Sequence, residues 1–154
     1  MAYSGISKAG LFFNTILYSG TGSTQNITGV GFQPDLVWNK TRNASEDHAL
    51  VDSVRGVTKT LYPSDSAAEQ TRAAGLTAFG TDGYTVGDGT YFGQNSRNYV
   101  SWNWKAGTTS SISGGSITPS SVSIDTTSGF GIYKWTGTGS AGTISHGLGA
   151  VPKF

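Results

Sequence analysis

The chain has 154 residues, which is the size of one domain and enough to bury a core. Charged residues make up only 12% of it and the net charge is +1, with no run of Lys or Arg, so nucleic acid is not an expected partner. There is no cysteine, no signal-peptide pattern and no apolar run of about 18 residues, which excludes disulfides and predicts no membrane span. This composition fits a protein made in a reducing cytoplasm.

The first half of the chain predicts strands followed by short helical insertions. Residues 11–20, LFFNTILYSG, are rich in strand formers and run into glycines that permit a turn. Residues 34–42 alternate weakly and predict a second strand. Residues 45–56 have helical spacing behind two possible caps and predict either one helical turn or a structured loop. The alanines of residues 64–80 favour a helix that ends at Gly75.

The second half predicts further strands, because aromatic and β-branched runs alternate there with Gly, Asp and Asn, as in a sandwich or barrel. These runs are GYTVG (83–87), TYFGQ (90–94), NYVSWNWKAG (98–107) and GFGIYKWTG (129–137). The run at 98–107 alternates best and is expected to cross the core. Its Val100, Trp102 and Trp104 share one face, which we expect to be the core face.

One phrase occurs twice. YSGTGSTQNITGVGFQP at 18–34 matches WTGTGSAGTISHGLGAVP at 135–152, with one inserted residue in the second copy. The matched pattern is an aromatic residue, x-Gly-x-Gly-Ser, an isoleucine and Gly-x-Gly-x-x-Pro. The second copy is either the start of a further repeat or a strand that closes the sheet beside the first copy, and we favour the first explanation.

This repeat suggests a division of the chain. Residues 1–106 form the main β module, and residues 107–128 are a Ser/Thr/Gly-rich tract that predicts a linker or a loosely specified edge. Residues 129–154 are a partial second copy of the motif at 13–36.

The wording of these segments resembles a family of repeat-bearing virion proteins of tailed, often marine, bacteriophages. The resemblance rests on ITGVGFQPDLVW, DSVRGVTK, YVSWNWKAG and GLGAVPK and covers residues 13–154. It implies a concanavalin-like β-sandwich in tail or fibre-like proteins and supplies no site residues. One departure is Asn39, where a branched apolar residue is expected.

Catalysis is not expected. Neither His48 nor His146 stands in a recognisable triad frame, and there is no G-x-S-x-G motif. The only glutamates are Glu46 and Glu69, and nothing pairs them as a glycosidase requires. His48 lies among acidic residues, but their spacing on a short turn argues against a metal set. The sequence predicts an ion pair between Asp52 and Arg55 instead.

A lectin-like site is the main candidate for chemistry, with turn formation as the competing role for the same residues. Sugar binding of this kind uses oxygen ligands, an aromatic platform and, in many lectins, calcium; Ca²⁺ is therefore the one cofactor considered. The candidate residues are Asp82, Tyr84, Asp88, Tyr91, Asn95 and Asn98, together with Trp38 and Trp135 beside the repeated turns.

The sequence therefore predicts an all-β, antiparallel β-sandwich or jelly roll that binds rather than catalyses. We expect a tail or fibre-type adhesion module, made in the bacterial host cytoplasm and carried in the virion, that binds host glycan or neighbouring virion subunits, with a homotrimer as preferred assembly. Capsid decoration is the alternative, and a polysaccharide-degrading enzyme is a weaker one. Exposed aromatics around a groove would favour glycan binding, whereas a flat apolar patch would favour assembly.

Overall fold

The computed structural model describes residues 7–107 and 111–152, and in them the fold is all-β, with 36% of residues in strands. The one helical element in this part of the chain is a short 3₁₀ helix, Ala9–Leu11. No helix of the described residues is long and apolar enough to cross a membrane. The all-β prediction is confirmed.

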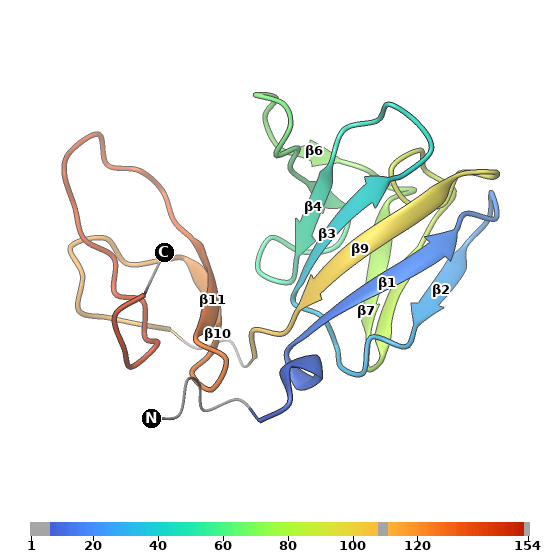
Figure 1. The fold of residues 1–154 in the computed structure, drawn as a ribbon. Helices are drawn as coiled ribbons and strands as arrows, with labels where there is room; N and C mark the ends of the chain where they lie inside the picture. Colours follow the sequence, from blue (N-terminus) through green and yellow to red (C-terminus); the bar gives the residue numbers. More distant parts are fainter. Residues whose placement is uncertain (1–6, 108–110, 153–154) are drawn as a thin grey trace.

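The main sheet has four antiparallel strands in the order β1-β9-β3-β4 (Figure 1). They are β1 (Phe13–Ser19), β9 (Asn98–Trp104), β3 (Leu36–Thr41) and β4 (Ala49–Asp52). The predicted strands around residues 11–20, 34–42 and 98–107 are therefore confirmed. As expected, β9 is a central strand, because β1 and β3 pair with its two edges.

A second, three-stranded sheet lies behind the first in Figure 1, in the order β2-β8-β7. Its strands are β2 (Gln25–Thr28), β8 (Gly83–Val86) and β7 (Leu76–Gly80). Ile27 and Val86 of this sheet belong to the same buried cluster as Val37 and Val51 of the main sheet. The core thus fills the space between two layers, and burial of this apolar surface is the main force that holds them together.

Two smaller pairs complete the fold: β5 (Lys59–Thr60) with β6 (Gln70–Thr71), and β10 (Ser121–Asp125) with β11 (Phe130–Lys134). The β10–β11 hairpin packs against the end of the main sheet. The Ser123 hydroxyl donates to the Gly107 carbonyl at 2.7 Å, and the ring of Phe130 stacks on Trp104 at 6.3 Å. Part of the tract at 107–128 is thus an ordered strand whose Val122 is buried.

The prediction of which face of β9 enters the core is wrong. Tyr99, Ser101 and Asn103 are the buried residues, whereas Trp102 and Trp104 lie half-buried on the opposite face. The buried side is polar because its polar groups bond to each other. Asn103 Nδ2 donates to Ser101 Oγ and to the carbonyl of Asn14, both at 3.1 Å. These bonds offset part of the cost of burying the polar groups, although Asn103 Oδ1 has no hydrogen-bond partner among the described residues.

Both predicted helical insertions are also wrong within the described residues. Residues 49–52 of the first form β4, because Ala49 and Val51 enter the shared core in register with β3. The second segment contains β6 and β7, and its alanines are largely exposed. A short helix with no apolar face to bury is not stable, so tertiary pairing overrides alanine propensity.

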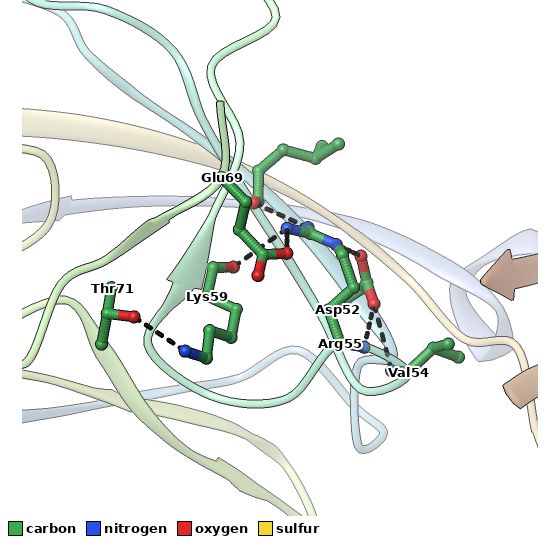
Figure 2. Close-up of polar contacts among 7 residues, drawn as sticks. Asp52, Val54, Arg55, Lys59, Glu69 and Thr71 are labelled. Atoms are coloured by element: carbon green, nitrogen blue, oxygen red, sulfur yellow. Dashed lines mark hydrogen bonds and ion pairs between the residues drawn. The ribbon is translucent and has the colours of Figure 1, made fainter. Parts of the chain in front are cut away.

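The turn that follows β4 carries the predicted ion pair (Figure 2). Arg55 Nε lies 2.6 Å from the buried Asp52 carboxylate, and Arg55 Nη1 lies 3.2 Å from Glu69. The same guanidinium donates to the carbonyls of Leu50 and Lys59. The ion pair between Asp52 and Arg55 is confirmed, and it joins the β4 turn to the chain near β5 and β6.

Candidate functional site

The outer face of the main sheet, on the side away from the second sheet, gathers aromatic side chains. Phe13 and Trp104 are paired across β1 and β9, with ring centroids 5.0 Å apart. Trp102 and Trp38 are paired across β9 and β3, with centroids 5.9 Å apart. Leu17 extends the same face and is 62% exposed. We call this set, with Val100 opposite Leu17, the outer aromatic face.

A histidine fixes one edge of the outer aromatic face. Trp38 Nε1 donates a hydrogen bond of 2.9 Å to His48 Nδ1, and the two rings meet edge to face. This bond satisfies the one polar atom of the indole and holds its ring against Trp102. The two tryptophan planes are inclined at 65°, so they do not form one level platform for a sugar ring.

A second candidate surface lies on the loop after β8, which the sequence predicted as a strand at 90–94. That prediction is wrong: the segment is a turn. Three core-facing side chains of the main sheet hold three successive carbonyls of this turn. Tyr99 Oη donates to Thr90 (2.7 Å), Asn39 Nδ2 to Tyr91 (2.5 Å) and Tyr18 Oη to Phe92 (2.8 Å). These three hydrogen bonds therefore hold the loop rigidly against the main sheet.

This loop forms one wall of an open pocket of about 320 Å³, and the segment before β7 forms the other. Thr71 and Arg72 come from the second wall, and Thr90 and Tyr91 come from the first. The walls approach closely at Gly89, where a Cβ atom would lie 2.5 Å from the Ala74 carbonyl oxygen. Glycine is required there by space.

The charged group of the pocket is Arg72. Its guanidinium carbon lies 5.3 Å from the centroid of Tyr91 and 5.6 Å from that of Tyr62, within the range of cation–π contacts. Arg72 Nε donates to Tyr62 Oη at 2.6 Å, and this bond raises the pKa of the guanidinium above its ordinary value. Burial raises the pKa of Tyr91, with the nearby Tyr62 as a further cause. The pocket therefore presents a fixed cation, two threonine hydroxyls and an aromatic edge.

The structure separates the predicted sugar-site residues. Asp88 and Tyr91 flank the pocket of Arg72, whereas Asp82 and Tyr84 line a different hollow between β2 and β8. Asp82 accepts backbone N–H bonds from Gly31 (2.6 Å) and Gly29 (3.0 Å), which lower the pKa of its carboxyl. Its oxygens are thus used to hold the glycine turn of the first phrase.

The remaining predicted residues are also dispersed. Asn98 pairs with Ser19 across the end of the main sheet, and Asn95 is exposed beside Gly22. Trp38 is on the outer aromatic face, and Trp135, which is 51% exposed, lies near the β10–β11 hairpin. No group of three or more His, Asp or Glu within residues 7–107 and 111–152 is arranged to hold a metal ion.

Sequence reasoning missed Tyr62, which precedes the segment expected to be helical, and Arg72, which lies within it. It also missed the outer aromatic face, although a signal was present. In β9, Val100, Trp102 and Trp104 share one face and are large and apolar, and only one face of a strand in this sheet can enter the core. Phe13 and Leu17 share a parity that pairs with Trp104 and Val100, which places all four on one face.

The described residues thus form an all-β module of antiparallel sheets with aromatic side chains on one outer face. Residues 8–154 match the model of a family described as a domain of unknown function (DUF7483), and the chain belongs to this family. Searches of curated proteins and of solved structures found no match.

Proposed function

We propose that this chain is a structural binding module of a bacteriophage virion and that the outer aromatic face is its contact surface. The virion as location is proposed from the resemblance to repeat-bearing tail and fibre proteins. The binding role is proposed from the geometry of the outer aromatic face. In this proposal, the two layers are a small concanavalin-like sandwich or jelly roll. That architecture is supported by the way the chain alternates between the two sheets from β1 to β9.

The observation that carries the proposal is the exposed apolar character of the outer aromatic face. Phe13 is 38% exposed and Leu17 62% exposed, and three ring systems lie beside them on the same sheet. Contiguous apolar patches of this kind mark protein contacts more often than sugar sites, which favour grooves with converging polar groups. Contact with a neighbouring subunit is the use that fits such a face.

The partner proposed for this face is another copy of the chain, in a homotrimer. A low charge of +1 on 154 residues gives little repulsion between copies at close approach. Burial of aromatic rings at the centre of an interface contributes most of its binding energy. Other virion proteins would then contact the assembled trimer.

Sedimentation equilibrium of the purified chain tests this proposal. We expect a trimer whose dissociation constant rises at least about tenfold in Leu17→Glu, because a buried, unpaired carboxylate is costly at an interface. The matched control is Leu11→Glu, since Leu11 is 52% exposed but lies in the 3₁₀ helix outside the sheet. A chain that stays monomeric at all concentrations, or equal effects of the two substitutions, would contradict the proposal.

Glycan binding is the second candidate function, and one observation favours it. The pocket between the loop after β8 and the segment before β7 holds Arg72 beside Tyr91 and Tyr62, and its volume of about 320 Å³ suits one or two sugar rings. The three core hydrogen bonds that fix its wall would spare a ligand the cost of ordering the loop. This use of the pocket is compatible with assembly through the outer aromatic face.

A further inference from the structure

Matching glycines in the two copies of the repeated phrase share positive φ angles. Gly22 and its counterpart Gly139 have φ angles of 72° and 73°. At the second pair of glycines, Gly29 and Gly31 both have φ of 86°, and their counterparts have 63° and 76°. Even a local side-chain bond recurs, since Thr21 donates to the Ser23 carbonyl and Thr138 to the Ser140 carbonyl, both at 3.3 Å.

In the first copy, the rest of the module surrounds this conformation. A Cβ atom on Gly20 would overlap the Gln94 carbonyl of the loop before β9, and one on Gly22 would lie 3.0 Å from Asn95. The Asp82 carboxylate holds the later glycine turn by two N–H bonds. Ile27 of the phrase is buried in the shared core.

In the second copy, the same positions are open. A Cβ atom on Gly137 or Gly139 would meet nothing within 4 Å among the described residues. Trp135, the counterpart of Tyr18, is 51% exposed, and Ile144, the counterpart of Ile27, is only partly buried. Glycine at 137 and 139 is thus not required by any neighbour in the described parts of this chain, although it is required at the matching positions of the first copy.

Within the described residues, β11 pairs with β10 at one edge, and its other edge corresponds to the edge that β1 uses for β9. Residues of a strand direct their N–H and C=O groups alternately to its two edges. In the first copy, Phe12 and Gly20 face β9, because the Phe12 carbonyl accepts from Lys105 and the Gly20 N–H donates to Arg97. Even-numbered residues of β1 therefore face β9.

In β11 the opposite edge of the strand is the paired one. The Lys134 carbonyl accepts from the Ser120 N–H, so Lys134 faces the β10 side. The counterpart of Lys134 in the first copy is Leu17, an odd-numbered residue that faces away from β9. The hairpin partner β10 thus occupies the edge that is outward in β1. Gly131, Tyr133 and Trp135 of the open edge correspond to the β1 residues that face β9.

We infer that the β10–β11 hairpin and residues 135–152 are the preformed opening part of a second module, and that the open edge of β11 receives a β9-type strand. The occupant is such a strand of another module of the same family, with a loop like Gly93–Asn95 and a carboxylate like Asp82 beside it. Strand addition of this kind supplies main-chain hydrogen bonds along the whole edge. This inference is independent of the outer aromatic face.

The acceptor is not the first module of this or a second copy. Its own β1 already occupies that place on β9, so the open edge of β11 needs a β9-type strand that has no β1 of its own.

An extended chain tests the inference. Residues 35–107, which follow the first phrase and contain β3 to β9, are repeated directly after Pro152. We expect the amide protons of Gly131, Tyr133 and Trp135 to exchange on the order of 100-fold more slowly in this chain than in the original, as measured by NMR. Unchanged exchange at these three amides would overturn the inference.

A matched pair of variants of the extended chain controls for indirect effects. Tyr133→Pro and Tyr133→Val both lose the hydroxyl that donates to the His146 carbonyl, but only the proline variant lacks an N–H on the open edge. We expect the valine variant to keep slow exchange at Gly131 and Trp135 and the proline variant to lose it. In both, slow exchange of Ile132 and Lys134 reports an intact hairpin. Equal protection of Gly131 and Trp135 in the two variants would contradict pairing at this edge.

Discussion

The side chain of Asn39 donates a hydrogen bond of 2.5 Å from Nδ2 to the main-chain carbonyl of Tyr91, which is 52 residues further along the chain. Asn39 is fully buried in the middle of the main sheet, where an apolar residue was expected from the sequence. Its polar side chain is there to fix the loop that walls the pocket. A buried polar residue in this fold thus serves a surface feature.

Replacement of Asn39 by leucine should destabilise the fold by about 1–3 kcal/mol, because the Tyr91 carbonyl would be left buried without its donor. Asn39→Asp should cost more, since it places an oxygen against that carbonyl. Urea unfolding followed by fluorescence measures both. The control is Asn95→Ala on the exposed loop, for which a change within about 0.5 kcal/mol is expected. A fully stable Asn39→Leu protein would show that the bond carries no stability.

The ion pair of Arg55 with Asp52 is expected to contribute more to the free energy of unfolding than the ion pair of Arg55 with Glu69. Asp52 is buried, so Arg55→Gln leaves an uncompensated carboxylate in the protein and should cost about 3 kcal/mol. Glu69→Gln should cost less than about 1 kcal/mol, because the Glu69 side chain is 39% exposed. Thermal and urea unfolding of the two variants measures both losses of stability. Equal losses would contradict the expectation that the buried ion pair contributes more than the exposed one.

The stability of the first glycine turn should depend on pH through Asp82. Two backbone N–H bonds, from Gly31 and from Gly29, hold the pKa of its carboxyl below the ordinary value of 3.8. The folded state therefore favours the carboxylate, and this stability is complete above about pH 4 and lost as the pH falls through the lowered pKa. In Asp82→Asn, unfolding measured between pH 5 and about pH 2 should change less with pH than in the wild type.

The control for Asp82 is Asp88→Asn, an exposed aspartate on the following loop, which should keep the wild-type pH dependence. If Asp82→Asn follows the wild-type curve, the two glycine N–H bonds do not contribute to stability. NMR titration of the Asp82 carboxyl would give the direction of its pKa shift directly.

If the pocket of Arg72 binds sugar, a glycan array should show binding that Arg72→Met reduces at least about tenfold, through the loss of charged hydrogen bonds. Arg97→Met is the matched control, because Arg97 lies outside the pocket lining. Arrays with and without Ca²⁺ also test the expected cofactor. Binding that survives Arg72→Met would exclude this pocket as the sugar site.

The all-β class and most strands could be predicted from the sequence because strand formers and glycine turns alternate along it. Which face of β9 is buried could not be predicted. Hydropathy places Trp102 and Trp104 inside, but the buried Ser101 and Asn103 are stabilised by hydrogen bonds that only the assembled sheet provides. The predicted helix at 45–56 failed for a related reason, since pairing of β4 with β3 is a long-range effect that local spacing does not contain.

The candidate residues were predicted from residue type within one stretch, and a turn-rich stretch disperses its side chains. Asp82, Asp88 and Asn98 follow each other closely in sequence, yet they lie on three different parts of the surface. Arg72 joins Tyr91 only through the close approach of two loops at Gly89. No sequence pattern reveals that approach. In contrast, the repeated phrase was visible in the sequence, and its two copies share their glycine conformations.

Under the proposed virion function, photo-cross-linking in phage particles tests the proposed contact surface most directly. A photoreactive amino acid is placed at position 17 on the outer aromatic face, or at position 11 outside it, and the cross-linked products are identified by mass spectrometry. We predict that position 17 cross-links to a second copy of the chain in assembled particles and that position 11 does not. The absence of a cross-linked dimer from position 17, or the same cross-linked products from both positions, would contradict the proposed contact surface.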